Sequence, residues 1–249
     1  MDGWQRMSRL ARLATIAVTF LAGSVAAAEP QTAAEQAEGE RLRTDWAQLA
    51  RYRDANRRLP PPGAARPRVV FFGDSITESW SLADLGLSQL EVLNRGIGGQ
   101  TTPQMLVRFR QDVVELKPAV VHILAGTNDL AGNTGPTTLE AIENNLSSMV
   151  EIATANHIAV VLASVLPTVD YPWRKGLEPA GKIVALNDWM RAYARRHKLV
   201  YADYDSAVAD ARSGFKSALA DDGVHPNRAG YAAMGPIARA AIRQALAAH

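Results

Sequence analysis

The chain has 249 residues, of which 47% are hydrophobic and 21% charged, and this composition predicts one compact globular domain with a sizeable core. It contains no cysteine, which excludes disulfide bonds, thiolate catalysis and cysteine-ligated zinc. Three of the 27 basic residues and one of the 25 acidic residues lie in residues 1–28, so the remainder carries 24 of each. A formally neutral chain does not offer the basic surface typical of nucleic-acid binding.

Residues 1–28 have the pattern of a secretory signal peptide. Arg6, Arg9 and Arg12 precede a 13-residue apolar run at 13–25, and small residues follow up to Ala28. The alternative is a membrane anchor, but an unbroken span needs about 20 apolar residues. No cysteine follows the run that could carry a lipid anchor. We therefore expect cleavage after Ala28 and a secreted or periplasmic product without a stable membrane anchor.

Residues 29–67 are predicted to form an N-terminal helix and a proline-rich linker that pack on a main domain of residues 68–249. The stretch 32–58 is rich in alanine, glutamate, arginine and glutamine, which favour a helix. Three prolines and a glycine at 60–63 end that helix. Its apolar residues at helical spacing are Leu42, Trp46, Leu49 and Tyr52.

From residue 69 onward, short apolar runs alternate with helical patterns, which predicts a parallel sheet covered by helices on both faces. Thr137 with Glu140 resembles a capping box at the start of one helix. In such sheets the active site lies at the carboxyl ends of the strands. The predicted strands cover 69–72, 92–93, 119–124, 158–163 and 199–201. The predicted helices contain Leu106, Phe109, Val113 and Leu116; Leu139, Ile142, Leu146 and Met149; Ile183, Leu186, Met190 and Tyr193; and a last helix at 228–247.

The first predicted strand runs directly into Gly73-Asp74-Ser75. A glycine at a sharp strand-to-helix turn lets the following serine project at the edge of the sheet, beside free N–H groups at a helix start. The alternative is structural, because Ser75 followed by Glu78 also spells a capping box.

Two further strands end in polar or glycine-rich segments. The second ends in 94–102, where three glycines allow close approach of the backbone, or form a turn or a nucleotide-binding loop. The third ends in 125–129, where the Asn128 amide can hold an oxyanion or form an Asx-turn.

The fifth strand is followed by 221–227, in which Asp222 precedes His225 by three residues. An aspartate so placed can accept one imidazole N–H and leave the other ring nitrogen free as a base. The alternative is a surface turn in which Asn227 caps the last helix. All four signals fall at the carboxyl edge of one sheet, and together they supply a nucleophile, a base and oxyanion donors.

These blocks resemble the SGNH (GDSL) hydrolase superfamily. The matching segments are 73–75, 94–99, 126–129 and 222–225, and the likeness runs from about Val69 to the C-terminus. The helix before the first strand and the 94–102 loop most resemble the branch of platelet-activating-factor acetylhydrolase catalytic subunits. One departure is that Ile76, rather than leucine, follows the serine.

The resemblance implies a three-layer α/β/α sandwich with a five-stranded parallel, flavodoxin-like sheet. It implies an exported serine carboxylic-ester hydrolase that forms an acyl-enzyme on Ser75, with no cofactor or metal. His225 would be the base, Asp222 rather than Asp221 its partner, and the Ser75 N–H, the Gly99 N–H and the Asn128 amide the oxyanion hole. The expected substrates are small-molecule or carbohydrate acyl esters. The alternatives are an O-acyl transferase, a thioesterase or lysophospholipase with the same triad, and a non-catalytic glycan-binding module.

Other polar residues are assigned structural roles. His122 lies inside an apolar strand and is expected in the core. Asp74 and Asp129 are each expected to brace their own turn. The segment 171–174 follows the fourth strand and either borders the substrate pocket or packs as a surface loop. The sequence shows no cluster with metal-ligand spacing.

Overall fold

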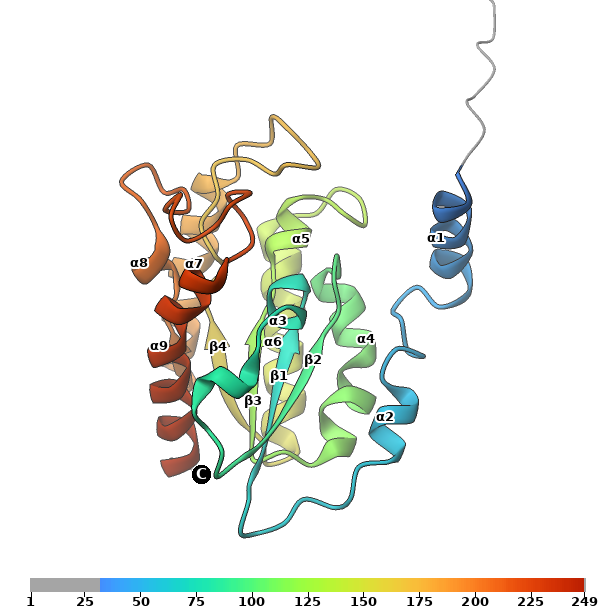
Figure 1. Ribbon diagram of the computed structural model, residues 1–249, viewed down its shortest axis with the longest axis vertical. Coiled ribbons are helices and arrows are strands. Elements are labelled where there is room, and N and C mark those ends of the chain that lie inside the picture. The colour runs from blue at the N-terminus through green and yellow to red at the C-terminus, as the bar shows by residue number, and fades with distance from the viewer. Residues whose placement is uncertain (1–31, 249) are drawn as a thin grey trace, which may run out of the picture.

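A computed structural model of the chain describes residues 32–248, so the predicted signal peptide lies outside the described residues. The protein has three layers, with a parallel sheet between two layers of helices (Figure 1). The strands lie in the order β2-β1-β3-β4-β5. The predicted three-layer fold with five parallel strands is therefore confirmed. The strands are β1 (Arg68–Gly73), β2 (Glu91–Gly96), β3 (Val120–Leu124), β4 (Ala159–Ala163) and β5 (Val200–Ala202).

Side chains of successive strand residues point to opposite faces, which divides the core in two. Val69 and Phe71 of β1 pack against the layer that contains α9, and Val70 and Phe72 pack against the layer of α4, α6 and α7. All four are fully buried, as expected for a sheet covered on both sides. The helices are α1 (Ala33–Thr44), α2 (Arg53–Arg57), α3 (Ser75–Glu78), η1 (Leu82–Leu85), α4 (Thr102–Asp112), η2 (Val114–Leu116), α5 (Thr127–Leu130), α6 (Leu139–Ala155), α7 (Ala180–Arg196), α8 (Asp205–Val208) and α9 (Arg228–Ala247).

The single helix predicted over 32–58 is wrong, because the chain forms α1 and α2 with an irregular segment, 45–52, between them. The Asp45 carboxylate accepts the N–H groups of Leu49 and Ala50, and Gln48 adopts a positive φ of 55°. Glutamine side chains from the body of the protein take up the freed carbonyls, with Gln104 donating to Trp46, Gln100 to Ala47 and Gln111 to Leu49. Tertiary contacts thus replace the local helical hydrogen bonds.

The start of α6 also differs from the prediction by one residue. The Thr138 hydroxyl, and not that of Thr137, accepts the backbone N–H of Ala141. The predicted Thr137–Glu140 capping box is therefore wrong, although the helix that it marked is present.

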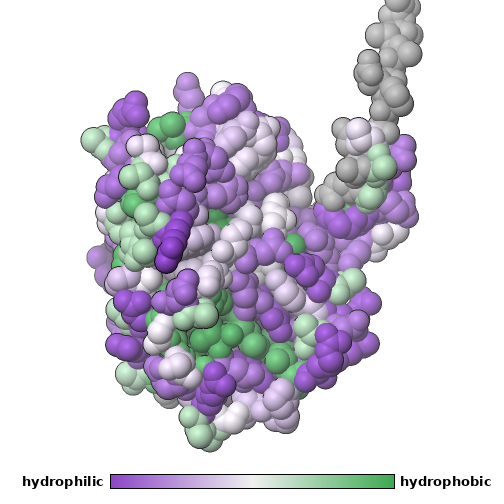
Figure 2. Space-filling model, viewed as in Figure 1, coloured by the Kyte–Doolittle hydropathy of each residue, from purple (hydrophilic) through white to green (hydrophobic). Residues whose placement is uncertain are grey.

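Most of the face shown in Figure 2 is hydrophilic, and hydrophobic residues gather in its lower half. Among residues 32–248, no helix is long and apolar enough to cross a membrane.

Candidate active site

Three neighbouring strands, β2, β1 and β3, end side by side at one edge of the sheet, and each leads into a segment singled out from the sequence. β1 leads into Ser75, β2 into Gly99 and β3 into Asn128. The loop before α9 brings His225 to the same edge, since its ring lies next to Ser75. The parallel arrangement therefore gathers residues separated by up to 150 positions in the chain.

Ser75 is the first residue of α3, and Asp74 is the N-cap. The Asp74 carboxylate accepts the N–H of Ile76 at 3.0 Å, so the alternative in which Ser75 caps this helix is wrong. The tight turn needs a glycine before it, because a Cβ on Gly73 would lie 2.6 Å from the Leu124 carbonyl oxygen. This geometry leaves the Ser75 hydroxyl free to point at His225.

The side chains of Ser75, His225 and Asp222 form a continuous hydrogen-bonded chain. Ser75 Oγ lies 3.0 Å from His225 Nε2, and His225 Nδ1 lies 2.6 Å from Asp222 Oδ2. The other carboxylate oxygen, Asp222 Oδ1, accepts the N–H groups of Val224 and His225. Asp221 instead accepts a hydrogen bond from Asn227, whose own side chain caps α9.

The environment of Asp222 favours its charged form. Partial burial opposes ionisation, but hydrogen bonds from the His225 ring and from two backbone N–H groups outweigh it and lower the pKa of Asp222. Since the His225 and Asp222 side chains are 36% and 40% exposed, water and substrate can reach this pair.

Two backbone N–H groups of the segments that follow β1 and β2 are left without a partner among the described residues. Within residues 32–248, the N–H groups of Ser75 and Gly99 have no hydrogen-bond acceptor. Gly98 differs, because its N–H donates to Glu78 Oε2 at 2.8 Å. Gly99 has a positive φ of 75°, which favours glycine at this position.

Asn128 lies at the same edge, but its amide is already engaged. Its Nδ2 donates to Asp74 Oδ2 and to the Gln100 carbonyl, each at 3.1 Å. Its Oδ1 accepts a hydrogen bond from Asn133 at 2.8 Å. A role as third oxyanion donor requires one of these N–H groups to change its acceptor, and it stays a prediction.

Asp74, expected to brace its own turn, also links the turn that carries Ser75 to the segment after the third strand, through Asn128. Burial raises the pKa of Asp74 to about 7, while the Ile76 N–H and the nearby His225 act in the opposite direction. Asp129 was expected to brace its own loop, but its carboxylate binds the N–H and hydroxyl of Thr102 instead. It therefore holds the start of α4 against the third strand.

Sequence reasoning missed several residues around the site. Asn133 Nδ2 also donates to the Gly99 carbonyl at 3.3 Å, and Asn133 Oδ1 accepts from Trp173 Nε1 at 3.1 Å. The Trp173 ring lies 5.9 Å from the His225 ring and the residue is 45% exposed, so the segment 171–174 does border the triad. Asn133 gave no sequence signal, because only the fold brings it to Gly99.

Arg108 was also missed, although the sequence contained a signal for it. The residues Met105, Arg108, Phe109 and Asp112 follow helical spacing, so a charged pair shares the apolar face of α4. The Arg108 guanidinium is fully buried and donates to the carbonyls of Gly73 and Arg95 at the ends of β1 and β2. Burial lowers its pKa to about 10, and Asp112 partly offsets this effect.

His122 is a core residue, as expected. It is fully buried, it stacks on Phe71 at 4.5 Å, and its Nε2 lies 2.8 Å from the Tyr204 hydroxyl. Burial lowers the pKa of His122 to about 3. This histidine is therefore neutral.

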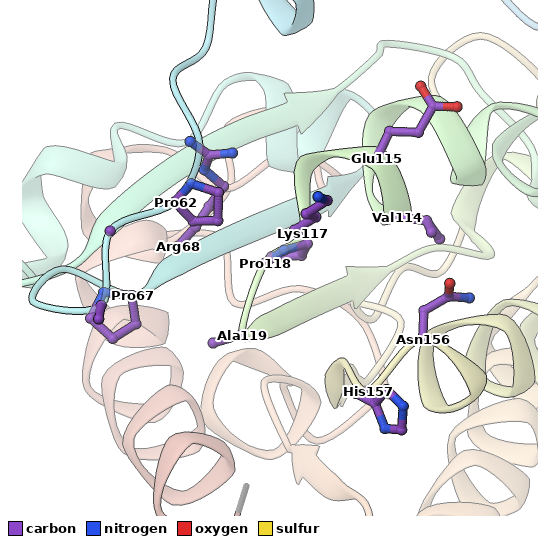
Figure 3. A pocket seen from close by; sticks show the side chains of 12 residues that line it. Pro62, Pro67, Arg68, Val114, Glu115, Lys117, Pro118, Ala119, Asn156 and His157 are labelled. Atoms are coloured by element: carbon purple, nitrogen blue, oxygen red, sulfur yellow. The ribbon is translucent and has the colours of Figure 1, made fainter.

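A cavity of about 850 Å³ opens at the other end of the sheet, where the strands begin (Figure 3). Pro67, Lys117, Pro118 and His157 are among its lining residues, and the lining contains no serine or threonine. Within residues 32–248, no group of three or more histidine, aspartate or glutamate side chains is placed to hold a metal ion.

Comparisons with known proteins agree with this arrangement. Residues 71–233 match the model of the GDSL-like Lipase/Acylhydrolase family. Platelet-activating factor acetylhydrolase IB subunit alpha1 of Pongo abelii is 28% identical over 181 residues, which cover 70% of this chain and 73% of that protein. The lipoprotein YqeF of Bacillus subtilis is 32% identical over 120 residues, 41% of this chain, and the match spans only 49% of YqeF.

Among solved structures, a candidate acylhydrolase from Bacteroides fragilis is 43% identical, with a TM-score of 0.78 over 82% of this chain and 99% of that one. The sequence resemblance to SGNH hydrolases is confirmed by these matches. Since the family model covers well over half of the chain, the protein belongs to the GDSL-like lipase/acylhydrolase family and is an ester hydrolase.

Proposed function

We propose that the protein is an exported serine carboxylic-ester hydrolase that removes small O-acyl groups through an acyl-enzyme on Ser75. The observation that carries this proposal is the Ser75–His225–Asp222 chain, with contacts of 3.0 and 2.6 Å, beside the free N–H groups of Ser75 and Gly99.

In the first half-reaction, Ser75 Oγ attacks the ester carbonyl carbon while His225 Nε2 takes the hydroxyl proton. Asp222 holds the ring through Nδ1 and stabilises the imidazolium that forms. The Ser75 and Gly99 N–H groups donate to the carbonyl oxygen as it gains negative charge, and loss of one such donor typically costs about 100- to 1000-fold in turnover. His225 then gives its proton to the alcohol oxygen, the C–O bond breaks, and the alcohol leaves.

In the second half-reaction, a water molecule replaces the alcohol. His225 removes a proton from this water, the hydroxide attacks the acyl carbon, and the bond to Ser75 Oγ breaks as the serine regains its proton. The products are the carboxylic acid and the free enzyme.

Two features favour a small acyl group. The catalytic His225 and Asp222 are more than a third exposed, so the triad lies in a shallow site. The acetylhydrolase relative is named for cleavage of an acetyl ester. Trp173 offers an exposed apolar ring beside His225 for the alcohol part of the substrate.

Export is supported by the basic, apolar and small-residue pattern of residues 1–28. Expression of the full-length sequence in a bacterial host with two membranes is expected to give periplasmic protein that begins at Glu29. Amino-terminal sequencing of the purified product tests this, and a cytoplasmic product that retains residues 1–28 would contradict it.

The activity is tested by hydrolysis of p-nitrophenyl esters from acetate to decanoate, with Ser75→Ala as the comparison. We expect kcat/KM to be highest for acetate and the variant to be inactive while its circular dichroism spectrum is unchanged. Highest turnover with long chains would favour a lysophospholipase or thioesterase. If the folded wild-type protein hydrolyses no ester, the proposal is wrong and acyl transfer or glycan binding takes its place.

A further inference from the structure

The segment Ile97–Gln100, which we call the oxyanion loop, contains two adjacent glycines. Without Cβ atoms, the peptide unit between Gly98 and Gly99 can rotate at little steric cost. That peptide unit carries the Gly99 N–H, which is a donor in the proposed oxyanion hole. Its orientation must therefore be fixed by contacts from outside the loop.

The carboxylate of Glu78 supplies such a contact. Its Oε2 accepts the Gly98 N–H at 2.8 Å, and its Oε1 lies 3.1 Å from Arg51 Nη2. Glu78 is the last residue of the four-residue helix α3, and Ser75 is the first. One short helix thus presents the nucleophile at its start and holds the oxyanion loop at its end.

Other contacts fix the residues on the two sides of this peptide unit. The Ile97 N–H donates to the Gly73 carbonyl at 3.0 Å, and Asn133 Nδ2 donates to the Gly99 carbonyl at 3.3 Å. Within residues 32–248, Gly99 is therefore the one position of the oxyanion loop whose N–H lacks an acceptor. The other N–H groups of the oxyanion loop are engaged in hydrogen bonds, which leaves the Gly99 N–H for the substrate.

The Arg51–Glu78 pair contributes little to overall stability. Their side chains are 50% and 35% exposed, and ion pairs with such exposure contribute little because water screens the two charges. Arg51 lies in the irregular segment 45–52, before the region 71–233 that matches the family model. The neighbouring Tyr52 hydroxyl donates to the Gly96 carbonyl, so this segment holds the base of the oxyanion loop as well.

We propose that Glu78, held by Arg51, is a positioning residue that keeps the Gly99 N–H aimed at the carbonyl oxygen of the substrate. This inference rests on the proposed ester hydrolysis. Removing the carboxylate leaves the glycine pair free to rotate, so the donor is correctly aimed for only part of the time. Binding of the ester in its ground state depends little on this donor, whereas the transition state depends on it strongly.

The test compares Glu78→Gln with Glu78→Met in the protein produced from the full-length sequence. Both replacements keep the length of the side chain, but only glutamine retains an oxygen that can accept the Gly98 N–H. With p-nitrophenyl acetate we expect kcat to fall about 10- to 100-fold in Glu78→Met, while KM stays within twofold of the wild-type value. In Glu78→Gln we expect kcat to fall less than fivefold. The inhibition constant of phenylboronic acid, whose tetrahedral serine adduct needs the same donor, should rise in Glu78→Met by about the same factor.

Arg51→Met is expected to lower kcat about two- to fivefold in the wild-type background and to have no further effect in Glu78→Met. Asp188→Ala, which breaks the exposed Arg191–Asp188 pair of α7, is the matched control and should leave kcat unchanged. Should Glu78→Met fail to fold, Glu78→Ala provides the same comparison. The inference is overturned if the folded Glu78 variant keeps wild-type kcat and boronate affinity. Failure of the proposed function is a separate outcome, in which wild-type protein itself hydrolyses no ester.

Discussion

The guanidinium of Arg108 donates a hydrogen bond to the carbonyl oxygen of Gly73 at 2.9 Å, two residues before Ser75. The same side chain binds the Arg95 carbonyl at the end of β2 and the Asp112 carboxylate one helical turn away. A buried cation thus ties together two strand ends and α4. The position of Ser75 therefore depends on a residue that takes no part in the chemistry.

Arg108→Met is expected to lower the free energy of unfolding by about 3–5 kcal/mol, because it leaves the buried Asp112 charge without its cation and removes the hydrogen bonds to the Gly73 and Arg95 carbonyls. Adding Asp112→Leu should recover part of that loss, since the unpaired charge is then removed as well. Urea unfolding followed by circular dichroism measures both effects. Arg110→Met on the exposed face of the same helix is the control, and an equal loss in this control would contradict the assignment.

Asp222→Asn is expected to lower kcat by about 1000- to 10,000-fold while the protein stays folded. Asparagine keeps the shape of the side chain but removes the charge that stabilises the His225 imidazolium, and it allows the wrong tautomer. Asp221→Asn is the matched control, because the adjacent Asp221 contacts Asn227 and not His225. Comparable losses in the two variants would mean that Asp222 is not the partner of the base.

Asp74 should make the protein less stable as pH rises toward neutrality. Burial raises its pKa to about 7 from an ordinary value of 3.8, so between these values the folded protein holds a proton that the unfolded chain releases. Its contribution to stability is complete below about pH 4 and is lost as pH rises through about 7. In Asp74→Asn this loss, of a few kcal/mol at most, should disappear from urea unfolding measured between pH 4 and 8. A pH dependence identical to that of wild type would show that Asp74 titrates normally.

His122 should have the opposite effect. Burial lowers its pKa to about 3 from 6.5, so below pH 6.5 the unfolded chain takes up a proton that the folded protein refuses. Its contribution is complete above pH 6.5 and is lost as pH falls toward 3, at up to about 1.4 kcal/mol per pH unit. The double variant His122→Phe/Tyr204→Phe removes this loss without leaving the Tyr204 hydroxyl unpaired. Unfolding of this variant between pH 4 and 6.5 should therefore lose less stability on acidification than unfolding of the wild type, and an unchanged acid sensitivity would contradict the assignment.

The sequence was sufficient to predict the architecture and the proximity of Ser75, His225 and Asp222. Five short apolar runs predicted five parallel strands, because a strand buried on both faces is apolar at most of its positions. We could predict that Ser75, Asp222 and His225 lie together because the ends of parallel strands meet at one edge of the sheet. In the structure, the Ser75–His225 and His225–Asp222 contacts are 3.0 and 2.6 Å. These features follow from local patterns and from one topological rule.

The tertiary structure decided the features whose hydrogen-bond partners lie far away in the chain. The helix predicted over 32–58 is interrupted because glutamines 53 to 62 residues away bind its carbonyls. Glu78 could have completed a local capping box, but it binds Gly98 and Arg51 instead. The Asn128 amide is turned toward Asp74 in the same way. Helix and strand patterns are determined by neighbouring residues in the sequence. A polar side chain instead forms a hydrogen bond with whichever donor or acceptor the folded chain brings within reach. Such partners come close only once the strands have been assembled.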